Sequence, residues 1–173
     1  MIVGTPKEIK NHEYRVGLTP ESAGELTARG HEVLVETNAG RDIGALNEDY
    51  EAVGAKIVGT AEEIFGRSEM VVKVKEPQAV ERAMLREGQI LYTYLHLAPD
   101  PEQTHDLIKS GAVCIAYETV TDNSGGLPLL KPMSQGWGCG AGKSPWRTRR
   151  SSWWRARSCA RQGCDYRRRR CRL

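Results

Sequence analysis

Short runs of β-branched and other apolar residues recur along the first part of the chain, and segments of helical character lie between them. Runs of three to five such residues have the length of buried strands, and strands that alternate with helices are typical of βαβ units in a parallel sheet. The six predicted strands are residues 2–5, 32–36, 56–58, 70–74, 90–94 and 113–117.

Three of the intervening segments have recognisable helix ends. A threonine or aspartate that can cap the helix precedes a proline at the first position, or a glutamate three residues later, and glycine follows the last turn. These signals are Thr19-Pro20 with Gly30, a capping box of Thr60 with Glu63, and Asp100-Pro101 with Gly111. The pattern predicts an α/β domain over residues 1–135, built on an open, mostly parallel, Rossmann-like sheet.

Two connections are longer than this architecture needs. Residues 7–18 are charged and lack apolar periodicity. A loop of that length inside a compact α/β unit is often functional. Residues 121–132 contain an Asn-Ser-Gly-Gly turn followed by Leu-Pro-Leu-Leu, which we interpret as a segment that leaves the domain.

The composition of the chain changes abruptly near residue 135. Residues 1–135 contain 13 lysines and arginines against 21 aspartates and glutamates, whereas residues 136–173 contain 12 basic residues and a single acidic one. Four of the five cysteines and all four tryptophans lie in this last segment. The acidic part has neither a signal-peptide pattern nor an apolar run of membrane-spanning length, so we expect a cytoplasmic domain in a reducing compartment.

Basic side chains follow three of the predicted strands. Arg15 lies in the long loop after the first strand, Lys73 and Lys75 come at the end of the fourth, and His96 follows the fifth. In an open parallel sheet, ligands bind beyond the carboxyl ends of the strands. Arginine offers a charged fork that fits a carboxylate, lysine can polarise a carbonyl, and histidine can transfer protons near neutral pH. The set predicts a site for a small α-keto or α-amino acid.

Each of these residues also has an ordinary structural interpretation. An arginine in a charged loop is commonly solvated, and a histidine after a strand is often a hydrogen-bonded structural residue. Lys73 and Lys75 alternate with valines, as they would on a half-exposed edge strand. Residue chemistry alone therefore leaves both interpretations open.

Several motifs in the first 135 residues point further. They are GTPKE (residues 4–8), EYRV (13–16), TP (19–20), ETNAG (36–40), VKVKEP (72–77) and LKPMS (130–134). Together they resemble the N-terminal part of the alanine dehydrogenase and proton-translocating transhydrogenase family. The stretch LYTYLHLA (91–98) resembles the alanine dehydrogenase branch, because the transhydrogenase branch lacks the histidine that stands here as His96.

The resemblance implies an NAD-dependent enzyme that reversibly converts L-alanine to pyruvate and ammonia. It implies substrate binding by Arg15, Lys75 and Tyr94, acid–base catalysis by His96, and cofactor contacts by Met133 and Ser134. We expect no metal site. The resemblance also implies a homohexamer and a separate dinucleotide-binding domain, whose glycine-rich turn this sequence lacks. We therefore expect a substrate-binding fragment without catalytic activity of its own and with an impaired or lost hexamer.

The last 38 residues break the family pattern. Their glycines do not form a phosphate-binding loop, because Trp137 and Lys143 stand where such loops need glycine. The cysteines at 159, 164 and 171 lack the paired spacing of a zinc site. Arginine at 167–170 and the tryptophans leave nucleic-acid binding as an alternative function, and a transhydrogenase-like domain is another.

The tail has the composition that a GC-rich gene gives in a shifted reading frame. Residues 143–156 can be back-translated so that another frame encodes a helix-like peptide, and that peptide resembles the continuation of the family sequence. We hypothesise a frameshift between residues 135 and 143, which resequencing of the gene would test. A segment so rich in arginine, with little apolar periodicity, is expected to be disordered.

Overall fold

The computed structural model describes residues 1–131. The predicted boundary at residue 135, the basic tail and the predicted cofactor contacts Met133 and Ser134 therefore lie outside the described part of the chain. No helix within the described residues is long and apolar enough to cross a membrane.

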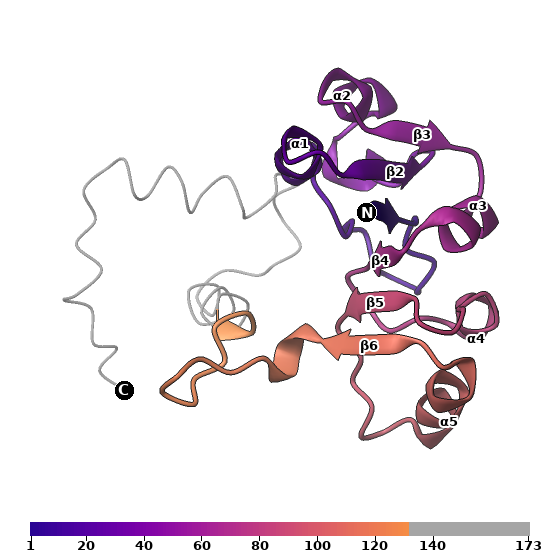
Figure 1. Ribbon diagram of the computed structural model, residues 1–173, viewed down its shortest axis with the longest axis vertical. Coiled ribbons are helices and arrows are strands. Elements are labelled where there is room, and N and C mark those ends of the chain that lie inside the picture. The colour runs from indigo at the N-terminus through magenta and orange to yellow at the C-terminus, as the bar shows by residue number, and fades with distance from the viewer. Residues whose placement is uncertain (132–173) are drawn as a thin grey trace. The chain divides into compact units, whose positions relative to one another are not determined.

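A single parallel sheet of six strands forms the centre of the domain (Figure 1). Its strand order is β3-β2-β1-β4-β5-β6, the order of a doubly wound Rossmann-like sheet. The strands are β1 (Ile2–Thr5), β2 (Glu32–Glu36), β3 (Lys56–Val58), β4 (Met70–Val72), β5 (Ile90–Thr93) and β6 (Val113–Ala116). The predicted fold class and all six strands are confirmed, although β4, β5 and β6 end one or two residues earlier than predicted.

Helices α1 (Pro20–Ala28), α3 (Ala61–Arg67) and α5 (Pro101–Ser110) begin at the predicted caps. The side chains of Thr19, Thr60 and Asp100 each accept a hydrogen bond from the backbone N–H three residues later. The capping box at Thr60 is only half formed, because the Glu63 carboxylate accepts from the N–H of Gly59 instead.

Two short helices were not predicted, namely α2 (Asn47–Ala52) and α4 (Ala79–Arg82), and neither were the 3₁₀ turns η1 (Arg41–Ile43) and η2 (Tyr117–Thr119). These elements are too short to show an apolar period. Instead, an acidic side chain in the first turn of each helix accepts a hydrogen bond from the backbone N–H of the N-cap residue. Asp49 accepts from Leu46 in α2, and Glu81 accepts from Gln78 in α4, each at 2.8 Å.

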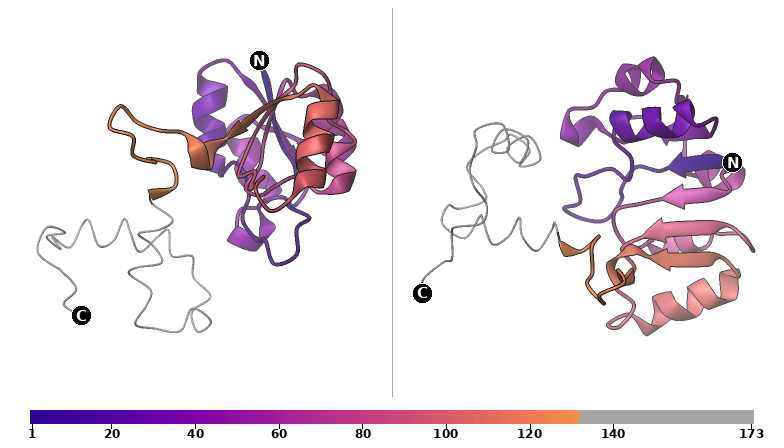
Figure 2. Two further views of the ribbon diagram at one scale, coloured as in Figure 1. Left: turned by 90° about the horizontal axis from the view of Figure 1, so that it is seen from below. Right: turned by 60° about the vertical axis from the view of Figure 1, so that its left-hand side comes forward.

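Helices cover both faces of the sheet (Figure 2). Alternate residues of β2 point to opposite faces, so Val33 and Val35 pack in the cluster that contains Ala23 of α1 and Tyr50 of α2. Leu34, between them, packs with Ile64 of α3 on the other face. The core thus consists of two layers, one on each side of the sheet.

The winding direction of the sheet reverses between β1 and β4, which lie side by side at its centre. The loop 7–18, after β1, and the chain after β4 therefore leave the sheet next to each other. Thr5 Oγ1 donates to the carbonyl of Val72 at 3.0 Å. Gly17 returns to the same carbonyl so closely that an added Cβ would lie 2.4 Å from Val72 O. This contact fixes the end of the loop over the switch point.

We expect Gly17→Ala to lower the free energy of unfolding by about 2 kcal/mol, because the new methyl group meets backbone that cannot yield without distorting the sheet. Urea denaturation of the whole chain measures the change. Gly66→Ala in α3 is the matched control: nothing lies within 4 Å of its added Cβ, and alanine should stabilise the helix by roughly 0.5–1 kcal/mol. Equal effects of the two substitutions would contradict the role given to Gly17.

Candidate functional site

The side chains of Lys75, Tyr94 and His96 meet beyond the carboxyl ends of β4 and β5. The Lys75 ammonium nitrogen lies 4.7 Å from the centroid of the Tyr94 ring, in cation–π geometry. On Tyr94, the His96 ring is stacked with its centroid 5.8 Å away and an interplanar angle of 21°. The structure thus brings together three of the residues that the sequence assigned to one site.

Hydrogen bonds from Thr93, at the end of β5, and from Tyr117, in η2, fix the backbone around Lys75. Thr93 Oγ1 donates to the carbonyl of Lys75 at 2.7 Å, and the Tyr117 hydroxyl donates to the carbonyl of Val74 at 2.9 Å. Burial raises the pKa of Tyr117 to about 12, although the charge of Arg15 acts in the opposite direction. The phenol therefore remains a neutral donor at physiological pH.

His96 stands at a turn that few side chains adopt. Its φ angle is +50°, in the left-handed region, where a non-glycine residue needs support from its surroundings. Glu118 supplies that support, because its Oε1 accepts from the backbone N–H groups of Leu95 and His96 at 3.0 and 2.9 Å. From α5, Gln103 Nε2 donates to the carbonyl of Leu95 at 2.6 Å. The backbone turn that carries His96 is therefore held by a carboxylate on the connection after β6.

Arg15 holds the carboxylate of Glu13 in a two-pronged ion pair. Arg15 Nε donates to Oε1 at 2.8 Å and Nη2 donates to Oε2 at 2.6 Å. The Arg15 side chain is 45% exposed, whereas that of Glu13 is 7% exposed. Burial opposes the charge of Glu13, but hydrogen bonds from Arg15 and the charges of Arg15 and Lys75 lower the pKa of Glu13 below its ordinary value. The alternative interpretation expected Arg15 to be solvated, whereas in the structure it has a defined partner in Glu13.

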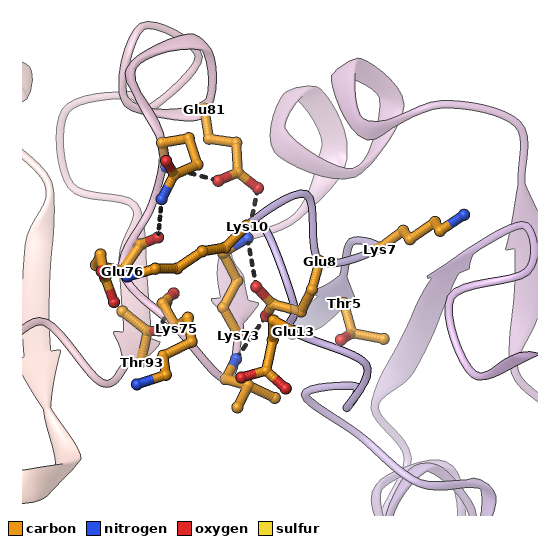
Figure 3. Close-up of polar contacts among 12 residues, drawn as sticks. Thr5, Lys7, Glu8, Lys10, Glu13, Lys73, Lys75, Glu76, Glu81 and Thr93 are labelled. Atoms are coloured by element: carbon orange, nitrogen blue, oxygen red, sulfur yellow. Dashed lines mark hydrogen bonds and ion pairs between the residues drawn. The ribbon is translucent and has the colours of Figure 1, made fainter. Parts of the chain in front are cut away.

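Lys73 does not join this group. Its side chain is 1% exposed, and its ammonium lies 2.5 Å from Glu81 Oε1 and 3.3 Å from Glu8 Oε2. Figure 3 shows the ammonium between the two carboxylates, with Lys75 pointing away from them. The edge-strand interpretation of Lys73 is wrong, because β4 is a central strand between β1 and β5 and this lysine is a buried cation.

The same cluster anchors the loop 7–18. Glu8 Oε1 accepts from the N–H of Val74 at 2.7 Å, and Lys10 forms an ion pair with Glu76. Burial raises the pKa of Glu8, which the charge of Lys73 and the Val74 hydrogen bond only partly offset. Two carboxylates facing one ammonium leave an excess negative charge, and that charge is costly in a dry environment.

Four residues of this site were not predicted from the sequence, namely Glu8, Glu13, Tyr117 and Glu118. The rule that selected His96 could have found Tyr117 and Glu118, since both follow β6 at the same edge of the sheet. Glu13 lies two residues before Arg15 in the same loop, but nothing in the spacing distinguishes a partner from a solvated acid.

Comparison with known proteins identifies the family of this domain. The model of the family described as alanine dehydrogenase/PNT, N-terminal domain, matches residues 4–136. The chain belongs to this family. Among curated relatives, the alanine dehydrogenase of Halomonas elongata is 54% identical over 134 residues, and those of Mycolicibacterium smegmatis and Bacillus subtilis are each 50% identical over 135. These stretches cover 78% of this chain but only 35–36% of each relative.

Solved structures of the alanine dehydrogenase/PNT family give the same result. An L-alanine dehydrogenase superposes with a TM-score of 0.78 at 48% identity, over 80% of this chain and 38% of that one. A transhydrogenase from Sinorhizobium meliloti superposes with a TM-score of 0.64 at 29% identity, over 68% of this chain and 35% of its own. The chain therefore spans about a third of the length of the family members it matches.

We expect Lys73→Met to lower the free energy of unfolding by about 3–5 kcal/mol, because it leaves two buried carboxylates without their cation. Lys75→Met is the matched control: it removes the same charge from a half-buried position whose described contact is with Tyr94, and it should cost about 1 kcal/mol or less. Chemical denaturation of both variants provides the measurement. If Lys73→Met were as stable as Lys75→Met, the buried cluster would not have the role assigned to it.

The pKa of Glu13 predicts a pH-dependent stability. A carboxyl group whose pKa is lowered by folding stabilises the native state above its ordinary value of 4.5, and this contribution is lost as the pH falls through the folded pKa. Glu13→Gln should therefore destabilise the domain by about 1 kcal/mol at neutral pH, with a smaller difference from wild type below pH 4.5. Urea titrations over this range, with exposed Glu25→Gln as the control, would reveal a pH-independent difference if the assignment were wrong.

Proposed function

We propose that residues 1–131 form the substrate half of an alanine dehydrogenase-type site, which binds pyruvate or L-alanine. The observation that supports this most directly is the convergence of Lys75, Tyr94 and His96 from two separate strand ends. Arg15 is paired with Glu13, whose pKa the charge of Lys75 also lowers. A cationic fork, a second cation, and a histidine on an aromatic ring are the groups that a small α-keto or α-amino acid requires.

Each residue has a distinct role in this proposal. Arg15 binds the substrate carboxylate through paired N–H donors, and Lys75 hydrogen-bonds the keto oxygen and draws electron density from the carbonyl carbon. Tyr94 contacts both the Lys75 ammonium and the His96 ring, so it helps to position the two groups. His96 takes up or delivers the proton as water adds to, or leaves, the imine carbon.

The described residues do not fit the dinucleotide that the family uses. In a Rossmann domain, the turn after the first strand carries glycines that bind the pyrophosphate at a helix N-terminus. Here the loop 7–18 fills that place, and it buries the carboxylate of Glu8, whose negative charge opposes phosphate. Hydride transfer to NAD would need a separate domain. We therefore propose that residues 1–131 bind substrate without turning it over, and hexamer formation and a cytoplasmic location stay predictions.

A transhydrogenase-like function is the second candidate within the same family. His96 argues against it, and so does the lower identity to the transhydrogenase structure, 29% against 48%. Nucleic-acid binding through the basic tail rests on residues outside the described part of the chain. Neither alternative accounts for the arrangement around Tyr94.

We expect the full chain to bind pyruvate, and Arg15→Gln and Lys75→Gln each to raise the dissociation constant at least about tenfold, because each removes a charged donor to the ligand. His96→Asn should change it less than about threefold, since the proposed role of His96 is proton transfer rather than binding. Calorimetric or NMR titration with pyruvate measures these constants.

The matched control for the lysine is Lys56→Gln, which removes a charge from an exposed side chain, 63% accessible, that pairs with Glu32. If Lys75→Gln weakened pyruvate binding no more than Lys56→Gln, Lys75 would not be a substrate ligand. Absence of pyruvate binding by the wild-type chain would contradict the proposed function itself.

A further inference from the structure

Glu13 is already bound to the Arg15 guanidinium, the group that the proposed function assigns to the substrate carboxylate. The guanidinium of Arg15 holds both oxygens of Glu13, at 2.8 and 2.6 Å, in the paired geometry that arginine forms with a carboxylate ligand. The backbone N–H of Arg15 adds a third hydrogen bond to Oε1, at 2.9 Å. An incoming carboxylate that uses the same two donors must therefore displace Glu13.

Glu13 also balances the charge of the second cation. Lys75 forms no ion pair with another residue in 1–131, yet its charge acts on Glu13 together with that of Arg15. At 7% exposure, the Glu13 side chain is shielded from water, so its charge is weakly screened. Glu13 thus offsets one of the two positive charges that Arg15 and Lys75 carry, and a ligand with one carboxylate needs less positive charge than a ligand with two.

We infer that Glu13 is a specificity-determining residue: an internal carboxylate that competes with the ligand for Arg15 and restricts the site to monocarboxylates. The identity of the natural ligand rests on the proposed function, but the competition rests on the Arg15–Glu13 pair alone. Without the charge of Glu13, Arg15 and Lys75 would present two positive charges, and a dicarboxylate would then gain more than a monocarboxylate.

The test compares the wild-type chain with Glu13→Gln in titrations with acetate, pyruvate and 2-oxoglutarate. Glutamine keeps the size of the side chain but places an N–H₂ group against Arg15 Nη2 or Nε, so it opens the fork. We expect acetate and pyruvate to bind about fivefold more tightly to Glu13→Gln, and the dianion 2-oxoglutarate to gain more than either. A merely structural role for Glu13 predicts weaker binding of all three.

Glu25→Gln is the control for net charge, because it makes the same charge change at an exposed residue of α1 that pairs with Arg29. It should leave all three dissociation constants unchanged. Unchanged or weaker binding of acetate to Glu13→Gln, or no binding at all, overturns the inference. An equal gain for Glu25→Gln overturns it too.

A measurement on the wild-type chain covers the case in which Glu13→Gln does not fold. The Arg15 Nε–H resonance reports directly on the hydrogen bond to Glu13 Oε1, and saturation with acetate should shift it as the ligand takes that donor. If acetate saturates the site while this resonance stays in place, Glu13 is not displaced and the inference fails.

The outcomes separate the inference from the proposed function. Tighter acetate binding to Glu13→Gln, with pyruvate no better than acetate and insensitive to Lys75→Gln, would support the competition and contradict the alanine dehydrogenase-type site. Pyruvate binding that depends on Lys75 but does not improve in Glu13→Gln would support the function and contradict the competition.

Discussion

The buried ammonium of Lys73 determines how the rest of the site can be arranged. It lies between Glu8, from the loop after β1, and Glu81, at the start of α4, and all three side chains are at most 2% exposed. Removing a charge from water costs several kcal/mol, and that cost is compensated here only while the three groups stay together. The loop 7–18 is therefore held to the centre of the sheet by charge, and Glu13 and Arg15 are carried on it.

Lys73 and Lys75 belong to the same motif but have different roles, and the difference arises because the strand ends just before them. In a continuous strand, residues 73 and 75 would point to the same face. β4 ends at Val72, however, and the chain bends at 74 and 75. The bend releases Lys75 towards Tyr94 while Lys73 stays in the interior. A prediction that extended the strand to residue 74 could not distinguish a buried cation from a ligand-binding one.

The sequence predicted the fold better than it predicted the site. Strands such as residues 32–36 can be predicted because runs of β-branched residues are typical of buried strands. Helix caps such as Thr19 can be predicted because they have a fixed spacing from the groups they bind. The sheet-edge rule, together with the family resemblance, selected Arg15, Lys75, Tyr94 and His96. The acidic partners were not predicted, because a carboxylate acquires a structural role only when the fold places a cation or a backbone N–H beside it.

These acidic partners explain how a domain with an excess of acidic residues can present a cationic site. Three carboxylates near the site are bound to the backbone: Glu8 to Val74, Glu13 to Arg15, and Glu118 to Leu95 and His96. A fourth, Glu76, pairs with the side chain of Lys10. A carboxylate that accepts backbone N–H groups has part of its charge compensated where it sits and is not available to a distant cation. Lys75 accordingly rests on the Tyr94 ring instead of pairing with an acid among the described residues. The charge that a small anion meets is set by where the acids are bound, and the net charge of the domain says little about it.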